Sequence, residues 1–213
     1  GAAAASCTIS SATSVIVVLG ASSAGASEAV VVTFNGGGSG AQVTKSGLVV
    51  LATPTVTSAA PTAGYVSSTI TLTGANFVTA AQDAAASCSA TVGGTAAACA
   101  LVDGTTLKVT IEAGTQPGGH VVAVTIATAG AVSPHNVGTS AADFVAVLAT
   151  PTASTFTPLA GYQSSSVTVT GASFITSAQG GACAATVGGA AAASCTISSA
   201  TSVIVVLGAS SAG

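Results

Sequence analysis

The chain has 213 residues, of which two are Lys, five are Asp or Glu and none is Arg, so the net charge is -3. Nucleic-acid binding needs Lys and Arg to replace counterions along the phosphates, and this composition excludes it. The mean hydropathy is +0.82, but no segment approaches the roughly 20 consecutive apolar residues that a membrane-spanning helix needs. We therefore expect neither a nucleic-acid partner nor a membrane span.

Internal repeats indicate how the chain is organised. Residues 1–25 are identical to residues 189–213, which gives a repeat of 188 residues (189 minus 1). A weaker repeat lies inside it, because Leu51-Ala-Thr-Pro54 recurs as Leu148-Ala-Thr-Pro151. We interpret the chain as one two-domain unit of a tandem array plus an overlap. The expected domains are the C-terminal part of a preceding domain (1–50), a complete domain (51–147) and the N-terminal part of a second domain (148–213), completed by the equivalent of 26–50.

In chain order, the segments with period-two alternation of apolar residues predict half-buried strands. They are separated by Gly, Pro and Asn clusters at about the 8–12-residue spacing of a β-sandwich. Val, Ile and Thr, which favour strands, dominate them. The fold class predicted is all-β, and the clearest strand segments are 29–34, 69–73, 107–111, 121–126 and 166–170.

Several short motifs occur in the same order in both domains. Each has Pro-x-Ala-Gly-Tyr, an alternating strand, then Gly and Phe, as in Gly74-Ala-Asn-Phe77 and Gly171-Ala-Ser-Phe174. A Thr-Val-Gly-Gly turn follows, between two Cys. This series resembles the IPT/TIG family of immunoglobulin-like domains. The resemblance implies tandem immunoglobulin-like sandwiches, but these domains occur in receptors, enzymes and transcription factors, so it implies no single function.

The cysteines flank the Thr-Val-Gly-Gly turn in both domains. One hypothesis is metal binding, although neither pair has a CxxC spacing or a His beside it. The other is one disulfide per domain across a hairpin, in an oxidising compartment. We favour the disulfides, and Cys7 is then the copy of Cys195 whose partner lies upstream. The pairs expected are Cys88 with Cys99 and Cys183 with Cys195.

Other polar residues do not assemble into a catalytic or metal-binding set. His120 and His135 have no carboxylate or second His at a useful local spacing, and surface or edge positions are expected for them. The Gly-rich segment from Asn35 to Gly40 departs from the phosphate-loop spacing and indicates a hairpin loop. We therefore expect no enzyme activity, no cofactor and no metal.

The surface must consist largely of Ala, Ser, Thr and Gly, because so few residues are charged. A soluble domain usually has roughly 25–35% charged residues on its surface, so this chain should self-associate or carry sugars. No Asn-x-Ser/Thr sequon occurs, which leaves the hydroxyl side chains as sites for O-linked glycans. The sites expected are Thr69, Thr71, Thr73, Ser166, Thr168 and Thr170 on alternating strands, and Thr53, Thr55, Thr150 and Thr152 beside Pro at the domain junctions.

These observations predict a structural protein, the subunit of an extracellular filament built head-to-tail from copies of itself and carrying covalent glycans. Val147 runs into Leu148-Ala-Thr-Pro151 without a Gly/Ser linker, so neighbouring domains should keep a fixed angle. A constant step generates a rod or helix. In composition and domain type the chain resembles algal surface filaments such as mastigonemes. The alternatives are an adhesin or cell-surface stalk module that binds glycan or another surface protein, and an accessory module of an enzyme.

Overall fold

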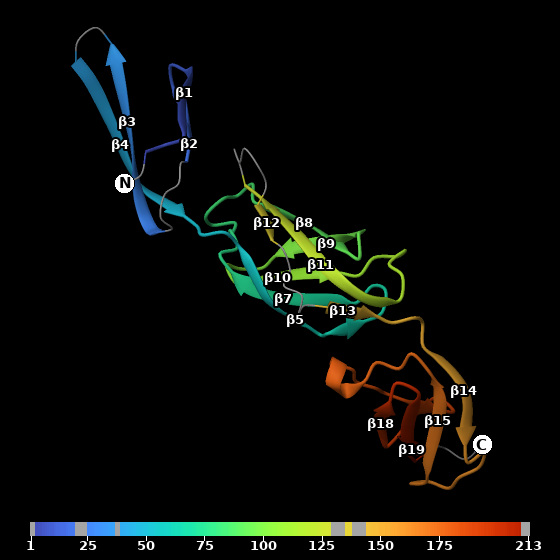
Figure 1. Cartoon of the computed structure of the whole chain (residues 1–213). Helices are drawn as coiled ribbons and strands as arrows, with labels where there is room; N and C mark the ends of the chain where they lie inside the picture. The colour runs from blue at the N-terminus through green and yellow to red at the C-terminus, as the bar shows by residue number, and fades with distance from the viewer. Residues whose placement is uncertain (1–2, 20–24, 37–38, 129–134, 138–143, 210–213) are drawn as a thin grey trace.

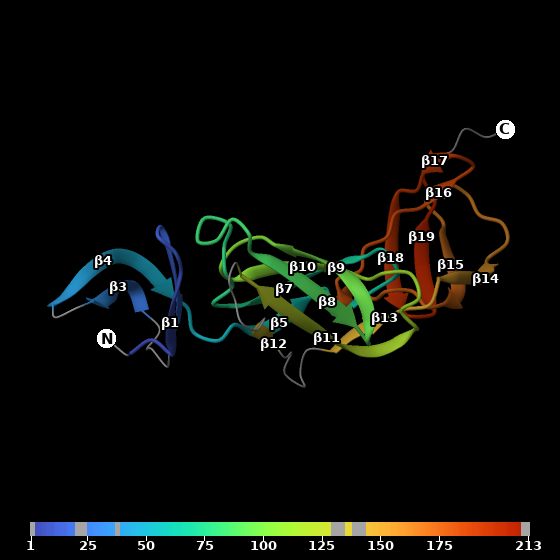
Figure 2. The same cartoon turned by 90° about the horizontal axis from the view of Figure 1, so that it is seen from above.

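The computed structural model describes residues 3–19, 25–36, 39–128, 135–137 and 144–209. These residues are almost entirely strands, and the prediction of an all-β fold is confirmed. Figure 1 shows three blocks in a row: two N-terminal hairpins, a central sandwich and a C-terminal block. The second view keeps the same order, with the hairpins and the C-terminal block at opposite ends of the sandwich (Figure 2).

The central block is a sandwich formed by residues 51–147. Its described strands pair in the order β5-β7-β10-β9-β8-β11-β13-β6, with β12 paired to β11. The pairs are antiparallel except β6 with β13, which run parallel. The strands are β5 (Thr55–Ala60), β6 (Ala63–Gly64), β7 (Thr69–Ala75), β8 (Ser87–Val92), β9 (Thr95–Leu101), β10 (Thr106–Thr110), β11 (Gly118–Ala127), β12 (His135–Val137) and β13 (Phe144–Val147).

Two strands are shared between the two layers of the sandwich. The first half of β9 pairs with β8 and its second half pairs with β10. Similarly, β11 pairs with β13 through its first residues and with β8 through its later ones. Each shared strand changes partner along its length, so the sheet folds over on itself and encloses one core.

The core follows from the alternation in the sequence. Ile70 and Leu72 of β7 are fully buried, while Thr69 and Thr73 beside them are exposed. They meet Val109 of β10 and Val122 of β11 in one apolar cluster. Burial of each such side chain contributes roughly 1.5–3 kcal/mol relative to exposure. The charge-poor sequence therefore still supplies a continuous core in this domain.

The N-terminal block consists of two hairpins, β1 (Ser6–Ser11) with β2 (Ser14–Val18) and β3 (Gly25–Gly36) with β4 (Ser39–Val50). The described strands of each hairpin pair with one another and not with the central sheet. The β3–β4 hairpin ends at Val50 and the β11–β13 pairing ends at Val147. Both of these Val precede a Leu-Ala-Thr-Pro motif, so β3–β4 has the same position relative to this motif as β11–β13.

The C-terminal block repeats the first half of the central sandwich. Its four-stranded sheet has the order β14-β15-β19-β18, matching β5-β7-β10-β9. A short 3-10 helix, η1, and the two-stranded pair β16–β17 lie between β15 and β18. The elements are β14 (Thr152–Thr157), β15 (Ser166–Ala172), η1 (Ser177–Gln179), β16 (Thr186–Val187), β17 (Ala190–Ala191), β18 (Ser194–Ser199) and β19 (Ser202–Val206).

Identical sequences have different burial in the two end blocks. The β1–β2 and β18–β19 hairpins have the same pairing register, shifted by 188 residues. In the C-terminal block β19 also pairs with β15, and Val205 is 7% exposed. Its copy Val17 remains half-buried in the isolated hairpin. The difference comes from the neighbouring strand, because the two hairpins have the same residues.

Candidate interdomain docking site

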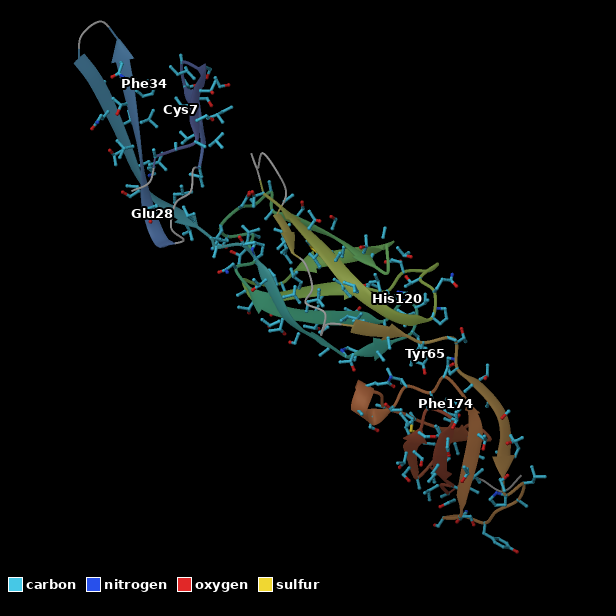
Figure 3. The ribbon with its side chains drawn as sticks, viewed as in Figure 1. Cys7, Glu28, Phe34, Tyr65, His120 and Phe174 are labelled. Carbon is cyan, nitrogen blue, oxygen red and sulfur yellow. A yellow bond between two sulfur atoms is a disulfide. The ribbon has the colours of Figure 1, made fainter. Side chains whose placement is uncertain are left out.

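The central sandwich and the C-terminal block meet at the side chain of Tyr65. Its hydroxyl donates a hydrogen bond of 2.6 Å to the Ser173 carbonyl and accepts one of 2.9 Å from the Ile175 N–H. Figure 3 shows Tyr65 between the two blocks, close to Phe174. A hydroxyl has one donor and two acceptor positions, and this one uses both functions on main-chain groups of the next domain. We name Ser173–Ile175 the receptor loop.

A tight turn holds Tyr65 at the end of the sandwich. The Tyr65 N–H donates to the Ser68 Oγ at 3.0 Å, and the Ser68 N–H donates back to the Tyr65 carbonyl. Ser67 has a φ of 72°, in the left-handed region that few non-glycine residues adopt. Its N–H donates to the Ile111 carbonyl at 2.7 Å, just beyond β10. The turn is therefore bonded to the core sheet, so the tyrosine projects from a rigid base.

The receptor loop is fixed within its own domain. Ser173 has a φ of 61°, and the Phe174 N–H donates to the Ala200 carbonyl at 2.9 Å. After the loop, the Gln179 Oε1 accepts hydrogen bonds from both the Thr176 N–H and hydroxyl, each at 2.9 Å. The Ser173 carbonyl and the Ile175 N–H, which bond to the tyrosine hydroxyl, are thus held by hydrogen bonds on both sides of the loop.

Two further contacts join the blocks. A Cβ added at Gly180, whose φ is +88°, would lie 2.9 Å from the Pro61 Cβ, so the two chains pass closely there. Four residues, 148–151, separate β13 from β14, and the Leu148 N–H donates to the Gly64 carbonyl at 2.8 Å. The connection is therefore short and anchored at its first residue. Together with the tyrosine contact, it joins the two blocks at two points.

The structure contains the two disulfides expected from the cysteine positions. Cys88 is bonded to Cys99 and Cys183 to Cys195, with Cα–Cα distances of 5.7 Å in both. The first joins β8 to β9 across the Thr-Val-Gly-Gly turn. Cys7 is free and exposed. The alternative of a metal site gains no support, since the described residues contain no group of three or more His, Cys, Asp or Glu that could hold an ion.

The other candidates from the sequence lie apart from the junction. The His120 Nε2 is 2.6 Å from the Gln116 carbonyl and donates to it when that nitrogen carries the proton. His135 belongs to β12, and its side chain lies outside the described residues. Asn35 pairs with Gly40 in the β3–β4 hairpin, as expected for a hairpin loop. Among the side chains that the structure describes, these candidates form no shared site.

The proposed glycan sites divide by exposure. Thr71 and Thr168 are half-buried. The other eight are exposed: Thr53, Thr55, Thr69, Thr73, Thr150, Thr152, Ser166 and Thr170. Within the described ranges, the structure contains no helix long and apolar enough to cross a membrane.

The fold of the central sandwich is that of an immunoglobulin-like module. Residues 54–141 match the family model described as IPT/TIG domain, so the chain contains an IPT/TIG domain. No curated protein matches the sequence. The family match is confined to the central domain, and the C-terminal block is assigned by its repeated motifs and pairing order.

Solved structures are similar in fold. A structure of the Plexin A4 full extracellular region, domains 1 to 10, is 14% identical with a TM-score of 0.51, covering 93% of this chain and 16% of that chain. A second structure of that region, with domains 1 to 8, has 18% identity, a TM-score of 0.48 and coverages of 73% and 15%. The Bacteroides ovatus protein SGBP-B, in complex with a mixed-linkage heptasaccharide, has 19% identity, a TM-score of 0.33 and coverages of 82% and 42%. The chain thus spans less than a fifth of the plexin chains, and the likeness with the TM-score of 0.51 indicates the fold alone.

Tyr65 is a junction residue that sequence analysis did not single out as a site. The sequence did contain a hint of its importance, because the chain has two Tyr and they occupy equivalent places in the repeated Pro-x-Ala-Gly-Tyr motif. Phe77 and Phe174 recur in the same way, so repetition alone did not distinguish the tyrosines. The partner groups gave no signal, since they are main-chain atoms.

Proposed function

We propose that the protein is the non-catalytic structural subunit of an extracellular or cell-surface filament, built head-to-tail from 188-residue repeats and carrying O-linked glycans. The observation that supports this most is the Tyr65 junction. The hydroxyl bridge and the anchored four-residue connection hold successive domains at two points. Repetition of a fixed step generates a rod or helix.

Completion of the C-terminal block gives the second argument. Ile70 and Leu72 are fully buried in the central sandwich, but their counterparts Val167 and Val169 are half-buried. The central domain covers these positions with β11, including Val122. Among the described residues, the sheet β14-β15-β19-β18 has no strand in the place of β11, so its face and one edge are uncovered there. Open edges are templates for pairing with another chain.

The β3–β4 hairpin fits this open face. Val30, Val32 and Phe34 correspond to Val122, Val124 and Ile126 of β11 in the sequence. The β11 residues are at most 3% exposed, whereas the β3 residues are half-buried. We propose that residues equivalent to 26–50, from the continuing chain or the next copy, complete the second sandwich. Both partly exposed apolar faces are then buried together.

Glycans would cover the remaining surface. The chain has seven charged residues among 213 (two plus five), so charge repulsion between neighbouring filaments would be weak. The eight exposed hydroxyl residues named above are distributed over strands and domain junctions. An uncharged sugar on such a hydroxyl adds bulk and hydration. The two disulfides are consistent with the oxidising compartment in which glycoproteins mature.

Two measurements on the same material test the proposal. The recombinant chain of residues 1–213 should form linear assemblies in electron micrographs without an added partner, whereas a chain lacking residues 26–50 should not. Native material should have a mass per repeat above that of the bare polypeptide. Monomers that bind glycans on an array and form no fibres would contradict the filament and favour the adhesin. A native mass equal to the polypeptide mass would remove the glycans from the proposal.

A further inference from the structure

Tyr162 repeats the geometry of Tyr65 without its partner. The Tyr162 N–H donates to the Ser165 Oγ at 3.1 Å, and the Ser164 N–H donates to the Leu207 carbonyl at 3.0 Å. Ser164 has a φ of 67°, as Ser67 has 72° in the first turn. The ring of Tyr162 is nevertheless 89% exposed. The turn that positions Tyr65 for docking is therefore present a second time, with its tyrosine projecting into solvent.

The central sandwich contains an unoccupied copy of the receptor loop, at Asn76–Val78. Asn76 has a φ of 62°, and the Phe77 N–H donates to the Gly104 carbonyl at 3.1 Å, as the Phe174 N–H donates to that of Ala200. Val78 is 6% exposed. Within the part of the chain that the structure describes, the Val78 N–H and the Asn76 carbonyl have no hydrogen-bond partner. Asn76 is half-buried and Val78 is buried, and buried main-chain groups such as the Val78 N–H are rarely left unpaired.

We propose that Tyr162 docks on Asn76–Val78 of the following repeat, with its hydroxyl donating to the Asn76 carbonyl and accepting from the Val78 N–H. The partner is another copy of this sequence. The Tyr65 junction within the chain is the template, since both halves of the second junction reproduce its turns and main-chain hydrogen bonds. This inference rests on the proposed head-to-tail order and specifies which surfaces meet.

The second junction differs from the first at one position. Gly180, which lies against Pro61, corresponds to Asp83 in the central sandwich. The Asp83 N–H donates to the Thr79 carbonyl, whereas the Gly180 N–H donates to that of Ser177. The Tyr162 junction therefore keeps the hydroxyl bridge but lacks the close proline–glycine contact. Two kinds of junction then alternate along the filament.

A two-repeat chain tests the inference directly. Residues 1–188 followed by residues 1–213 continue the array as the identical segments imply. The first-repeat Tyr162 then precedes an Asn76–Val78 loop, whereas the second-repeat Tyr162 does not and serves as the matched control. The sequence has no Trp, so Tyr→Phe changes elsewhere leave one tyrosine as the fluorescent reporter.

Acrylamide quenching distinguishes the outcomes. The first-repeat Tyr162 should be quenched several-fold less than the second-repeat Tyr162, and to about the same extent as the first-repeat Tyr65. Hydrogen exchange at the second-repeat Val78 amide should slow relative to the first-repeat amide, and Tyr162→Phe in the first repeat should abolish that difference. Equal quenching of both Tyr162 residues, or Val78 protection that survives the Phe substitution, would overturn the inference. These readouts lie within one chain, so they remain interpretable even if no filament forms.

Discussion

Replacement of Tyr65 by Phe keeps the aromatic ring and removes the oxygen that joins the two domains. The hydroxyl donates a hydrogen bond of 2.6 Å to the Ser173 carbonyl and accepts one of 2.9 Å from the Ile175 N–H. A typical intramolecular hydrogen bond contributes roughly 0.5–1.5 kcal/mol net, so the two hydrogen bonds of the bridge together contribute about 2 kcal/mol. Because 1.4 kcal/mol corresponds to a factor of ten, the population of chains with separated domains should rise roughly 30-fold.

Hydrogen exchange followed by NMR measures this effect at the bond itself. In Y65F the Ile175 amide should exchange about 30-fold faster, in proportion to the opened population, while the Leu107 amide inside the central sandwich should keep its rate. Y162F is the matched control, because it makes the same chemical change at a ring that is 89% exposed. The reasoning fails if Y65F leaves the Ile175 rate unchanged, or if Y162F accelerates it equally in the monomeric chain.

The remaining predictions concern the junction, a disulfide and a turn. Gly180→Asp should push Pro61 away and change the angle between the two blocks while the Tyr65 hydroxyl bridge remains, because its φ of +88° disfavours a side chain and its Cβ would meet Pro61; unchanged small-angle scattering would contradict this. Replacing both Cys88 and Cys99 by Ser should lower the free energy of unfolding in urea by about 3 kcal/mol, since the bridge constrains the unfolded chain. The Thr105 N–H and hydroxyl both donate to the Asp103 carboxylate, and these hydrogen bonds hold the pKa of Asp103 below its ordinary 3.8. The stability that this provides is present above pH 3.8 and is lost as the pH falls through the lower folded value; urea titrations at several pH values should show that loss in wild type and not in Asp103→Asn.

The strands could be predicted from the sequence because each one depends on local alternation. Ile70 and Leu72 alternate with Thr, and a period of two places them on one face. The structure buries both completely. The shared strand β9 could not be predicted in this way. Its Ala-rich sequence contains no signal for changing partners halfway, because that change depends on β8 and β10, which pair with different halves of it.

The docking site shows where sequence reasoning stops. Tyr65 and Tyr162 lie in the same motif and the same turn. One is hydrogen-bonded across a junction and the other is 89% exposed. Tyr65 bonds to the receptor loop of the neighbouring block, whereas Tyr162 has no such partner among the described residues; the local sequence does not encode this difference. The partner atoms are main-chain groups, so different residues serve at equivalent positions, such as Ser173 and Asn76.

The Tyr65 junction is assembled from uncharged groups: a phenol, a carbonyl, an amide N–H and the Pro61–Gly180 contact. Dissolved ions screen interactions between charges and have little influence on short hydrogen bonds or packing between neutral groups. The angle between the domains should therefore stay the same from dilute fresh water to brine. A filament with such junctions would keep its pitch and stiffness when salinity changes, because its shape does not depend on ion pairs.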